Sequence, residues 1–299
     1  MLYNMKDLLS VAVKYNFAVP AFNVSDYYMM KELVELAEDQ KAPLILEIHP
    51  DELRHTGPEF VTAIREKVSK IKIPVCIHLD HGADFTQVMT AIRAGFTSVM
   101  IDGSSLPFEE NIAICKKVAE AAHAVNVSVE GELGTIGTTN DKQAEAGADA
   151  IIYTDPDDVE QFLERSGVDT LAVAIGTCHG LYPKGFIPKL RLDILEEIRS
   201  RVKLELLKEI KKVVNVPLVL HGGSNNPDEE IREAVVKGIN KINISSDIKT
   251  AYFMKMRKVL QDETLREPFA IQPDCGEAMK EVAAHKMELL QTTGKAVLY

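Results

Sequence analysis

Three histidines and an aspartate stand at the ends of apolar runs that are typical of β-strands. Asp80 ends the run PVCIHLD and is followed by His81, His179 follows LAVAIGTC, and His221 lies in PLVLHGG. Each run ends in a turn signal, so three remote stretches of chain can point ring nitrogens at one metal ion. Three histidines leave a fourth position open for water or substrate, as catalytic zinc requires. The pattern predicts a metal enzyme.

Carboxylates end several of the same runs. Because Asp80 precedes His81 directly, it can face a substrate held by the metal and act as a general acid/base; the alternative is that it only orients a histidine. Asp102 and Glu132 also end predicted strands, and Glu130 shares a strand face with Glu132. These residues are candidates for binding a second cation or for orienting the histidines. The alternative is that they are ordinary polar residues that fill the interior of the fold.

The remaining histidines carry weaker signals. His123 and His285 lie inside helical patterns, where surface or packing roles are expected. His49 ends the second predicted strand and His55 follows it, so both can approach the site, but the sequence fixes no role for them.

Small residues follow the last three predicted strands. These turns are His179-Gly180, HGGS (221–224) and NISSD (243–247). Backbone N–H groups and hydroxyls in such turns bind phosphate, and a phosphate site after strands seven and eight recurs in α/β barrels. We therefore expect a phosphorylated ligand within reach of the metal.

The order of the elements predicts the fold class. Short β-branched runs alternate with amphipathic helical stretches, which indicates parallel strands joined by right-handed crossovers. The eight predicted strands are 18–24, 43–49, 74–80, 98–103, 127–134, 170–177, 217–223 and 241–247. Eight strands with polar ends favour a single (β/α)8 TIM barrel over residues 1–299, with a C-terminal helical extension. A doubly wound open sheet is the competing architecture.

Composition narrows the partners. The net charge of −11 opposes binding to nucleic acid and to anionic membranes, and no apolar run is long enough to span a bilayer. Four widely spaced cysteines without a CxxC pair indicate reduced thiols and a cytoplasmic location. A small-molecule substrate is the expectation that remains.

Two segments depart from the alternation. The stretch from Thr135 to Ala148 is rich in Gly and Thr, so we expect a mobile loop that is either a lid or a plain surface excursion. The stretch LDILEEIRSRV (192–202) is nearly repeated by LELLKEIKKVV (204–214), which predicts a helix that is lengthened or doubled before strand seven.

Six of these motifs, in this order, carry a resemblance to a known family. The motifs are HLDHG, IDGS, VEGELG, AVAIGTCHGLYP, PLVLHGGS and KINISSD, and they cover nearly the whole chain. They closely resemble the class II ketose-bisphosphate aldolases, with the tagatose-bisphosphate type nearest and the fructose-bisphosphate type close behind.

The resemblance implies a zinc-dependent barrel that cleaves a ketose 1,6-bisphosphate to dihydroxyacetone phosphate and glyceraldehyde 3-phosphate. It implies His81, His179 and His221 as zinc ligands and Asp80 as the acid/base. A second metal position would involve Asp102 and Glu132. It also implies a dihydroxyacetone phosphate pocket, formed partly through a monovalent cation, by Gly180, Gly222, Gly223, Ser224, Asn243, Ile244, Ser245 and Ser246. A homodimer or homotetramer is expected.

Two positions differ from the pattern of the relatives. Their loop after ELG carries a glutamate that moves a dihydroxyacetone phosphate proton, and here Asp141 is the nearest carboxylate. The C-terminal segment lacks the arginine that some relatives use for the distal phosphate, so Arg266 or another basic residue would have to replace it.

Other chemistries stay open at this point. A lysine Schiff base is disfavoured, because no lysine ends a strand run and Lys241 begins the last one. A metal-dependent barrel hydrolase usually has HxH at its first strand, where this chain has AFNV. A noncatalytic phosphosugar-binding barrel would keep the glycine turns without needing the metal.

Overall fold

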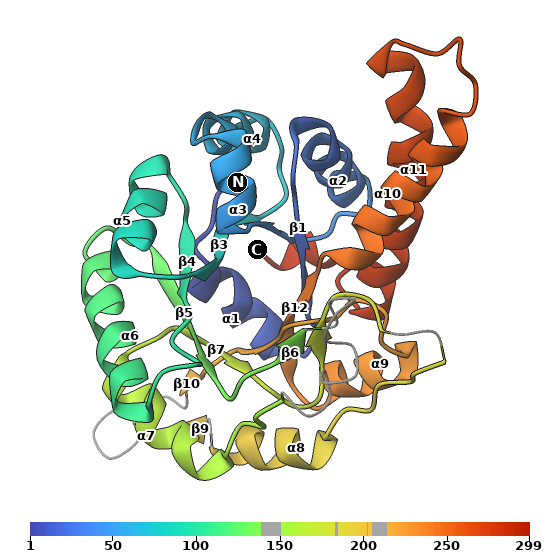
Figure 1. Ribbon diagram of the computed structural model, residues 1–299. Helices are drawn as coiled ribbons and strands as arrows, with labels where there is room; N and C mark the ends of the chain where they lie inside the picture. The colour runs from blue at the N-terminus through green and yellow to red at the C-terminus, as the bar shows by residue number, and fades with distance from the viewer. Residues whose placement is uncertain (139–150, 183–184, 202, 205–213) are drawn as a thin grey trace.

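The computed structural model describes residues 1–138, 151–182, 185–201, 203–204 and 214–299. Within this part of the chain, eight parallel strands form a closed barrel (Figure 1). In barrel order they are β1 (Val19–Asn23), β12 (Ile239–Ile244), β11 (Leu218–Leu220), β7 (Thr170–Val173), β5 (Ser128–Leu133), β4 (Ser98–Ile101), β3 (Val75–Gly82) and β2 (Leu44–Ile48). All eight correspond to predicted strands, so the barrel is confirmed and the open sheet is excluded.

Helices surround the barrel and cover the outward faces of its strands (Figure 1). They are α2 (Tyr27–Asp39), α3 (Pro50–Thr56), α4 (Glu59–Ser69), α5 (Phe85–Ala94), α6 (Phe108–His123), α7 (Pro156–Ser166), α8 (Leu192–Arg201) and α9 (Asp228–Val236). Their amphipathic patterns bury one face each, and the main hydrophobic core lies between this helical layer and the strands.

A separate helix closes the N-terminal end of the barrel. Helix α1 (Met5–Tyr15) buries Met5, Leu8, Leu9 and Ala12 completely. These side chains pack in one cluster with residues of the first strands, including Ala21, Ile45 and Cys76. Burial of each large apolar side chain stabilises the fold by ~1.5–3 kcal/mol. This end is therefore sealed, and only the opposite end is open for a site.

The predicted C-terminal helical extension is confirmed. Helices α10 (Ser246–Val259) and α11 (Pro268–Leu289) pack against each other and project beyond the barrel (Figure 1). After α11, a short 3-10 helix, η2 (Lys295–Leu298), leads to Tyr299, whose hydroxyl donates to the Leu8 carbonyl at 2.7 Å. The chain end is thus fixed against α1.

The structure describes the repeated segment only in part. Helix α8 covers the first copy and ends at Arg201, so the first copy is not lengthened. Strands β9 (Lys203–Leu204) and β10 (Val214–Asn215) then pair antiparallel at the two ends of the second copy. Residues 205–213, between them, lie outside the described residues.

The structure also bears on the expected state of the cysteines and on the expected lack of membrane-spanning segments. All four cysteines are buried thiols. Among the described helices, none has the length and apolar character that crossing a membrane requires.

Candidate active site

An irregularity in β3 lets two neighbouring residues face the same cavity. Consecutive residues of a regular strand point to opposite faces. Here the pairing of β3 with β4 shifts register between Leu79 and Gly82, and His81 has φ +48°. Such a backbone costs ~1–3 kcal/mol in a non-glycine residue and is typical of functional sites. As a result, Asp80 and His81 both line a cavity of about 630 Å³.

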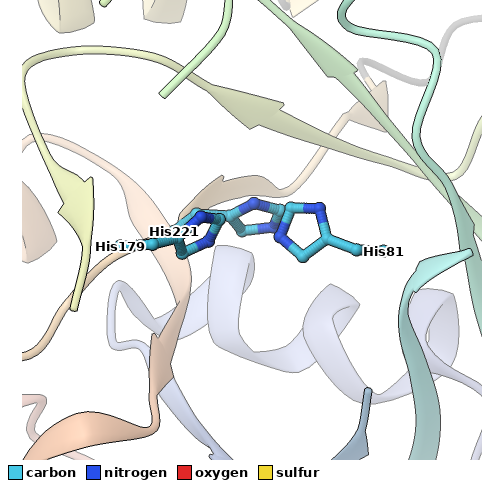
Figure 2. A group of neighbouring side chains, drawn as sticks. All are labelled: His81, His179 and His221. Atoms are coloured by element: carbon cyan, nitrogen blue, oxygen red, sulfur yellow. The ribbon is translucent and has the colours of Figure 1, made fainter. Parts of the chain in front are cut away.

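The structure brings the three predicted histidines together. The ring centres of His179 and His221 each lie 4.8 Å from that of His81, and the three rings face a common point (Figure 2). His221 follows β11, whereas His179 lies in β8 (Cys178–His179), which pairs with β6 (Gly137–Thr138). One nitrogen from each ring falls within 4.8 Å of the other two, a geometry that can hold a metal ion.

Hydrogen bonds hold the rings of His81 and His221 through one nitrogen each, which leaves the second nitrogen of each ring for another partner. His81 contacts Asp102 through Nδ1 (2.7 Å), and His221 contacts Glu130 through Nε2 (2.9 Å). In the described part of the chain, the buried His81 Nε2 and His221 Nδ1 have no hydrogen-bond partner. A buried polar atom without a partner is costly, and a metal ion satisfies both nitrogens while the carboxylates hold the rings. The residues therefore fit a metal ion.

A second group of ligand atoms overlaps the first. His81, Asp102 and Glu132 also place one atom each within 4.8 Å of the others. Burial raises the pKa of Glu132 to about 7, although His221 and His81 oppose the rise. Because His81 belongs to both groups, a cation in the second position changes the surroundings of the first.

Two amides hold the Asp80 carboxylate in place, and nearby positive groups keep it ionised. Asn23 donates to Oδ2 at 2.8 Å and Asn243 to Oδ1 at 3.2 Å. Burial by itself raises the pKa of Asp80, but the nearby histidines, Lys241 and Asn23 outweigh it and hold the pKa below its usual range. The role of Asn23 was missed from the sequence, where its place at the end of the first strand in AFNV was the available signal.

Lys241 is buried inside the barrel as the third residue of β12, whereas the sequence predicts it as the first residue of this strand. Its ammonium contacts Glu47 at 2.7 Å and Glu130 at 2.9 Å. Burial lowers the pKa of Lys241, but the two carboxylates outweigh it and raise the pKa above its usual value. A charged amine cannot attack a carbonyl, which supports the choice against a Schiff base.

Glycine and serine turns form the other side of the cavity. Six of the eight predicted phosphate-pocket residues line it, namely Gly180, Gly222, Ser224, Asn243, Ser245 and Ser246. Gly222 has φ +62°, and a Cβ there would lie 2.5 Å from the Cys178 carbonyl oxygen, so a side chain is excluded. Ser246 begins α10, whose N-terminus favours an anion.

The other two predicted pocket residues do not line the cavity. The Gly223 N–H donates to the Asn243 carbonyl at 2.9 Å, which fixes the turn against β12. Ile244 is 1% exposed and belongs to the hydrophobic core. Both support the turns from behind.

The rim of the cavity was largely missed from the sequence. His49 lines the cavity and caps α3 by accepting the Asp51 N–H at Nδ1 (3.2 Å), whereas His55 is exposed outside it. Lys249 lines the cavity and donates to Glu52 at 2.9 Å.

Three remaining predictions fall away from the cavity or outside the described residues. Arg266, between α10 and α11, is not among the lining residues of the described chain. Asp141 lies outside the described residues. His123 and His285 form peripheral contacts with Asp169 and Asp228, both at 2.7 Å, in line with their expected surface roles.

Comparisons with known proteins agree with this geometry. The family described as fructose-bisphosphate aldolase class-II matches residues 3–295. The chain is 38% identical to a fructose-bisphosphate aldolase of Geobacillus stearothermophilus, over 99% of both chains. It is also 38% identical to the D-tagatose-1,6-bisphosphate aldolase subunit GatY of Klebsiella oxytoca, over 93% of both chains.

A solved structure extends the likeness to three dimensions. The YdjI aldolase of Escherichia coli K12 superposes with a TM-score of 0.82 at 29% identity, covering 99% of this chain and all of that one. The three converging histidines, the closed barrel and the near-complete coverage of the relatives all point to the same family. The chain belongs to the class II fructose-bisphosphate aldolase family and is a lyase.

Proposed function

We propose that the protein catalyses the reversible, zinc-dependent cleavage of a ketose 1,6-bisphosphate to dihydroxyacetone phosphate and D-glyceraldehyde 3-phosphate. The observation that carries the proposal is the ionised Asp80 beside the converging His81, His179 and His221, at a cavity that Asp80, His81 and His179 line. Fructose and tagatose 1,6-bisphosphate are both within the proposal, because relatives named for each sugar are equally similar.

The roles of the residues follow from the reaction. Zinc held by the three histidines would supply a positive centre for the negative charge that develops when the C3–C4 bond breaks. Asp80 takes the proton of the C4 hydroxyl during cleavage and returns it during condensation. Asn23 and Asn243 hold the carboxylate in place for this transfer, because each donates to a different oxygen.

The phosphate of the dihydroxyacetone half is assigned to the glycine and serine turns. Ser224, Ser245 and Ser246 line that side of the cavity, and the N-terminus of α10 faces it. A monovalent cation beside this phosphate, or a second divalent cation at Asp102 and Glu132, belongs to the same proposal. Lys249 is the cation on the described rim that can meet a further anionic group of the substrate.

The C3 proton of dihydroxyacetone phosphate needs a base of its own. Asp141 is proposed for this role from its place in the sequence. Glu132 is the alternative within the described cavity, because it is buried there and burial raises its pKa to about 7.

The assembly is proposed to be a homodimer or homotetramer in the cytoplasm. The projecting α10 and α11 region exposes large apolar side chains, among them Phe253, Met254, Leu260 and Phe269. Exposed apolar surface of this kind is typical of association sites. Sedimentation at micromolar concentration, with Phe269→Glu as the comparison, measures the assembly; a monomer at all concentrations would contradict it.

Steady-state cleavage of both sugars, before and after chelation, tests the proposed function. Activity on at least one sugar that disappears with chelator and returns with zinc is the expected result. Cleavage of neither sugar, or full activity after exhaustive chelation, would overturn the proposal. The ratio of kcat/KM for the two sugars then assigns the preferred C4 configuration.

A further inference from the structure

A charged cluster lies inside the barrel, below the histidines. It consists of Glu47 on β2, Lys241 on β12 and Glu130 on β5, and all three residues are 0% exposed. The Lys241 ammonium contacts Glu47 Oε1 at 2.7 Å, Glu130 Oε2 at 2.9 Å and Glu130 Oε1 at 3.1 Å. A buried ammonium such as that of Lys241 keeps its charge only when it is closely paired, so the cluster is held to one geometry.

Among the described residues, the cluster connects to the three converging histidines through Glu130. Glu130 Oε1 also contacts His221 Nε2 at 2.9 Å, so a continuous chain of contacts runs from Lys241 through Glu130 to the His221 ring. Because Lys241 contacts both oxygens of Glu130, it prevents the carboxylate from turning away from His221. Glu47 lies on the far side of Lys241 and has no contact with His221 among the described interactions.

This arrangement selects one form of the His221 ring. A carboxylate accepts hydrogen bonds, so it favours the form in which His221 carries its proton on Nε2. The lone pair then lies on Nδ1, the buried nitrogen that has no hydrogen-bond partner in the described part of the chain. Because Glu130 occupies Nε2, Nδ1 is the nitrogen of His221 left to join His81 and His179 in binding a metal ion, and only this form gives Nδ1 a lone pair.

We propose that Lys241 is a positioning residue of the metal centre, which acts through Glu130 to keep the Nδ1 lone pair of His221 directed at the metal. The inference rests on the metal site of the proposed function and adds what sets its affinity. Loss of such an outer contact typically weakens metal binding by roughly 10–100-fold. Lys241 touches neither the metal nor the substrate in this proposal.

Two variants separate this role from general support of the barrel. Glu47→Gln is the matched control, because it changes the same buried cluster but leaves the contacts from Lys241 to Glu130 and from Glu130 to His221 in place. The double variant Glu47→Gln with Lys241→Met removes the cation and, at the same time, the titratable group that contacts it, so it differs from the control only at Lys241. A third variant, Glu130→Gln, breaks the connection from the other side and keeps the pair of Lys241 and Glu47.

Zinc affinity and the His221 proton position are measured in all three variants. The zinc Kd is obtained by competition with a chelator, and the position of the proton is read from nitrogen-15 NMR of the histidine rings in metal-free protein. Relative to Glu47→Gln, the double variant and Glu130→Gln should each bind zinc roughly 10–100-fold more weakly and show a mixed protonation pattern at His221.

Chemical denaturation of the metal-free proteins completes the test. A variant that is folded but binds zinc weakly has lost positioning and not stability. If the double variant does not fold, Glu130→Gln decides the question by the same two measurements. Unchanged zinc affinity or an unchanged His221 ring in a folded variant would overturn the inference, as would an equal loss of affinity in Glu47→Gln. These measurements use no sugar, so they stay separate from any failure of the proposed reaction.

Discussion

The two sides of the cavity are built from different parts of the chain. On one side, here called the histidine side, side chains supply the chemistry. They are Asp80, His81, Asp102 and Glu132 of β3, β4 and β5, together with His179 and His221, which converge on His81. On the side of β11 and β12, the turns supply backbone N–H groups and hydroxyls, and Gly222 admits no side chain at all. The first side depends on the identity of each side chain, and the second depends on the path of the backbone.

This difference predicts that substitutions on the two sides will impair different steps of the reaction. A substitution on the histidine side should change metal content or turnover, because charges there meet the reacting atoms. A substitution on the glycine and serine side should weaken substrate binding, because its groups meet the phosphate in the ground state and in the transition state alike.

Removal of the metal should have the largest effect. Chelation, or His81→Ala, should lower kcat at least roughly a thousandfold, since a bound metal ion contributes several kcal/mol of charge stabilisation. Borohydride with substrate should leave the enzyme active. His285→Ala, which removes an exposed histidine bonded to Asp228, is the control and should behave as wild type. Inactivation by borohydride only in the presence of substrate would indicate an imine instead.

Asp80→Asn should have the second-largest effect on turnover. The amide cannot take a proton, so turnover should fall roughly a hundredfold or more while zinc stays bound, since a positioned acid/base contributes on that scale. Zinc content is measured beside kcat in the same preparation. Normal turnover would remove Asp80 from the mechanism, and lost zinc would make it a support for His81.

The base for the C3 proton can be identified without C–C cleavage. Exchange of hydrogen between C3 of dihydroxyacetone phosphate and solvent reports that step alone. Asp141→Asn should slow the exchange more than it weakens zinc binding, by roughly tenfold or more. Glu132→Gln is the comparison within the described cavity. If only Glu132→Gln slows the exchange, the base lies on β5 and not on the loop.

The histidine side was the more predictable one from the sequence. His81, His179 and His221 each follow an apolar run, and parallel strands bring such ends together, so a barrel predicts their convergence. Asp102 and Glu130 were among the carboxylates predicted to orient the histidines, and they contact His81 and His221. Glu47 and its pairing with Lys241 were missed, because nothing local distinguishes a buried carboxyl group that faces a lysine from a solvated one.

The glycine and serine side was predictable in outline only. The small residues of the turns indicated a phosphate site, but Gly223 and Ile244 turned out to support the turns from behind. Which residues of a turn face a ligand depends on dihedral angles set by tertiary contacts, such as the approach of Gly222 to Cys178. The rim residue His49 ends a predicted strand, which indicated its place near the site but not its role.

Ser246→Ala tests the glycine and serine side. A hydrogen bond to a charged group contributes ~1.5–3 kcal/mol, so KM for dihydroxyacetone phosphate in the condensation direction should rise roughly tenfold with little change in kcat. Ser104→Ala, which removes a hydroxyl bonded to Asp102 on the histidine side, should leave this KM unchanged. Equal KM changes in both variants would mean that the phosphate does not distinguish the two sides.

The smallest effect on catalysis is expected for Glu47→Gln, beneath both sides. Burial and the charge of Asp80 outweigh Lys241 and raise the pKa of Glu47 from 4.5 to about 8. Between these values the folded protein holds a proton that the unfolded chain has lost, so the free energy of unfolding falls as the pH rises through this window. Glutamine stays neutral, so the variant should lose this slope, at most about 1.4 kcal/mol per pH unit for one proton, and gain relative stability near pH 8. Urea denaturation of metal-free wild type and Glu47→Gln from pH 5 to 8 measures it; parallel curves would place the proton elsewhere in the cluster.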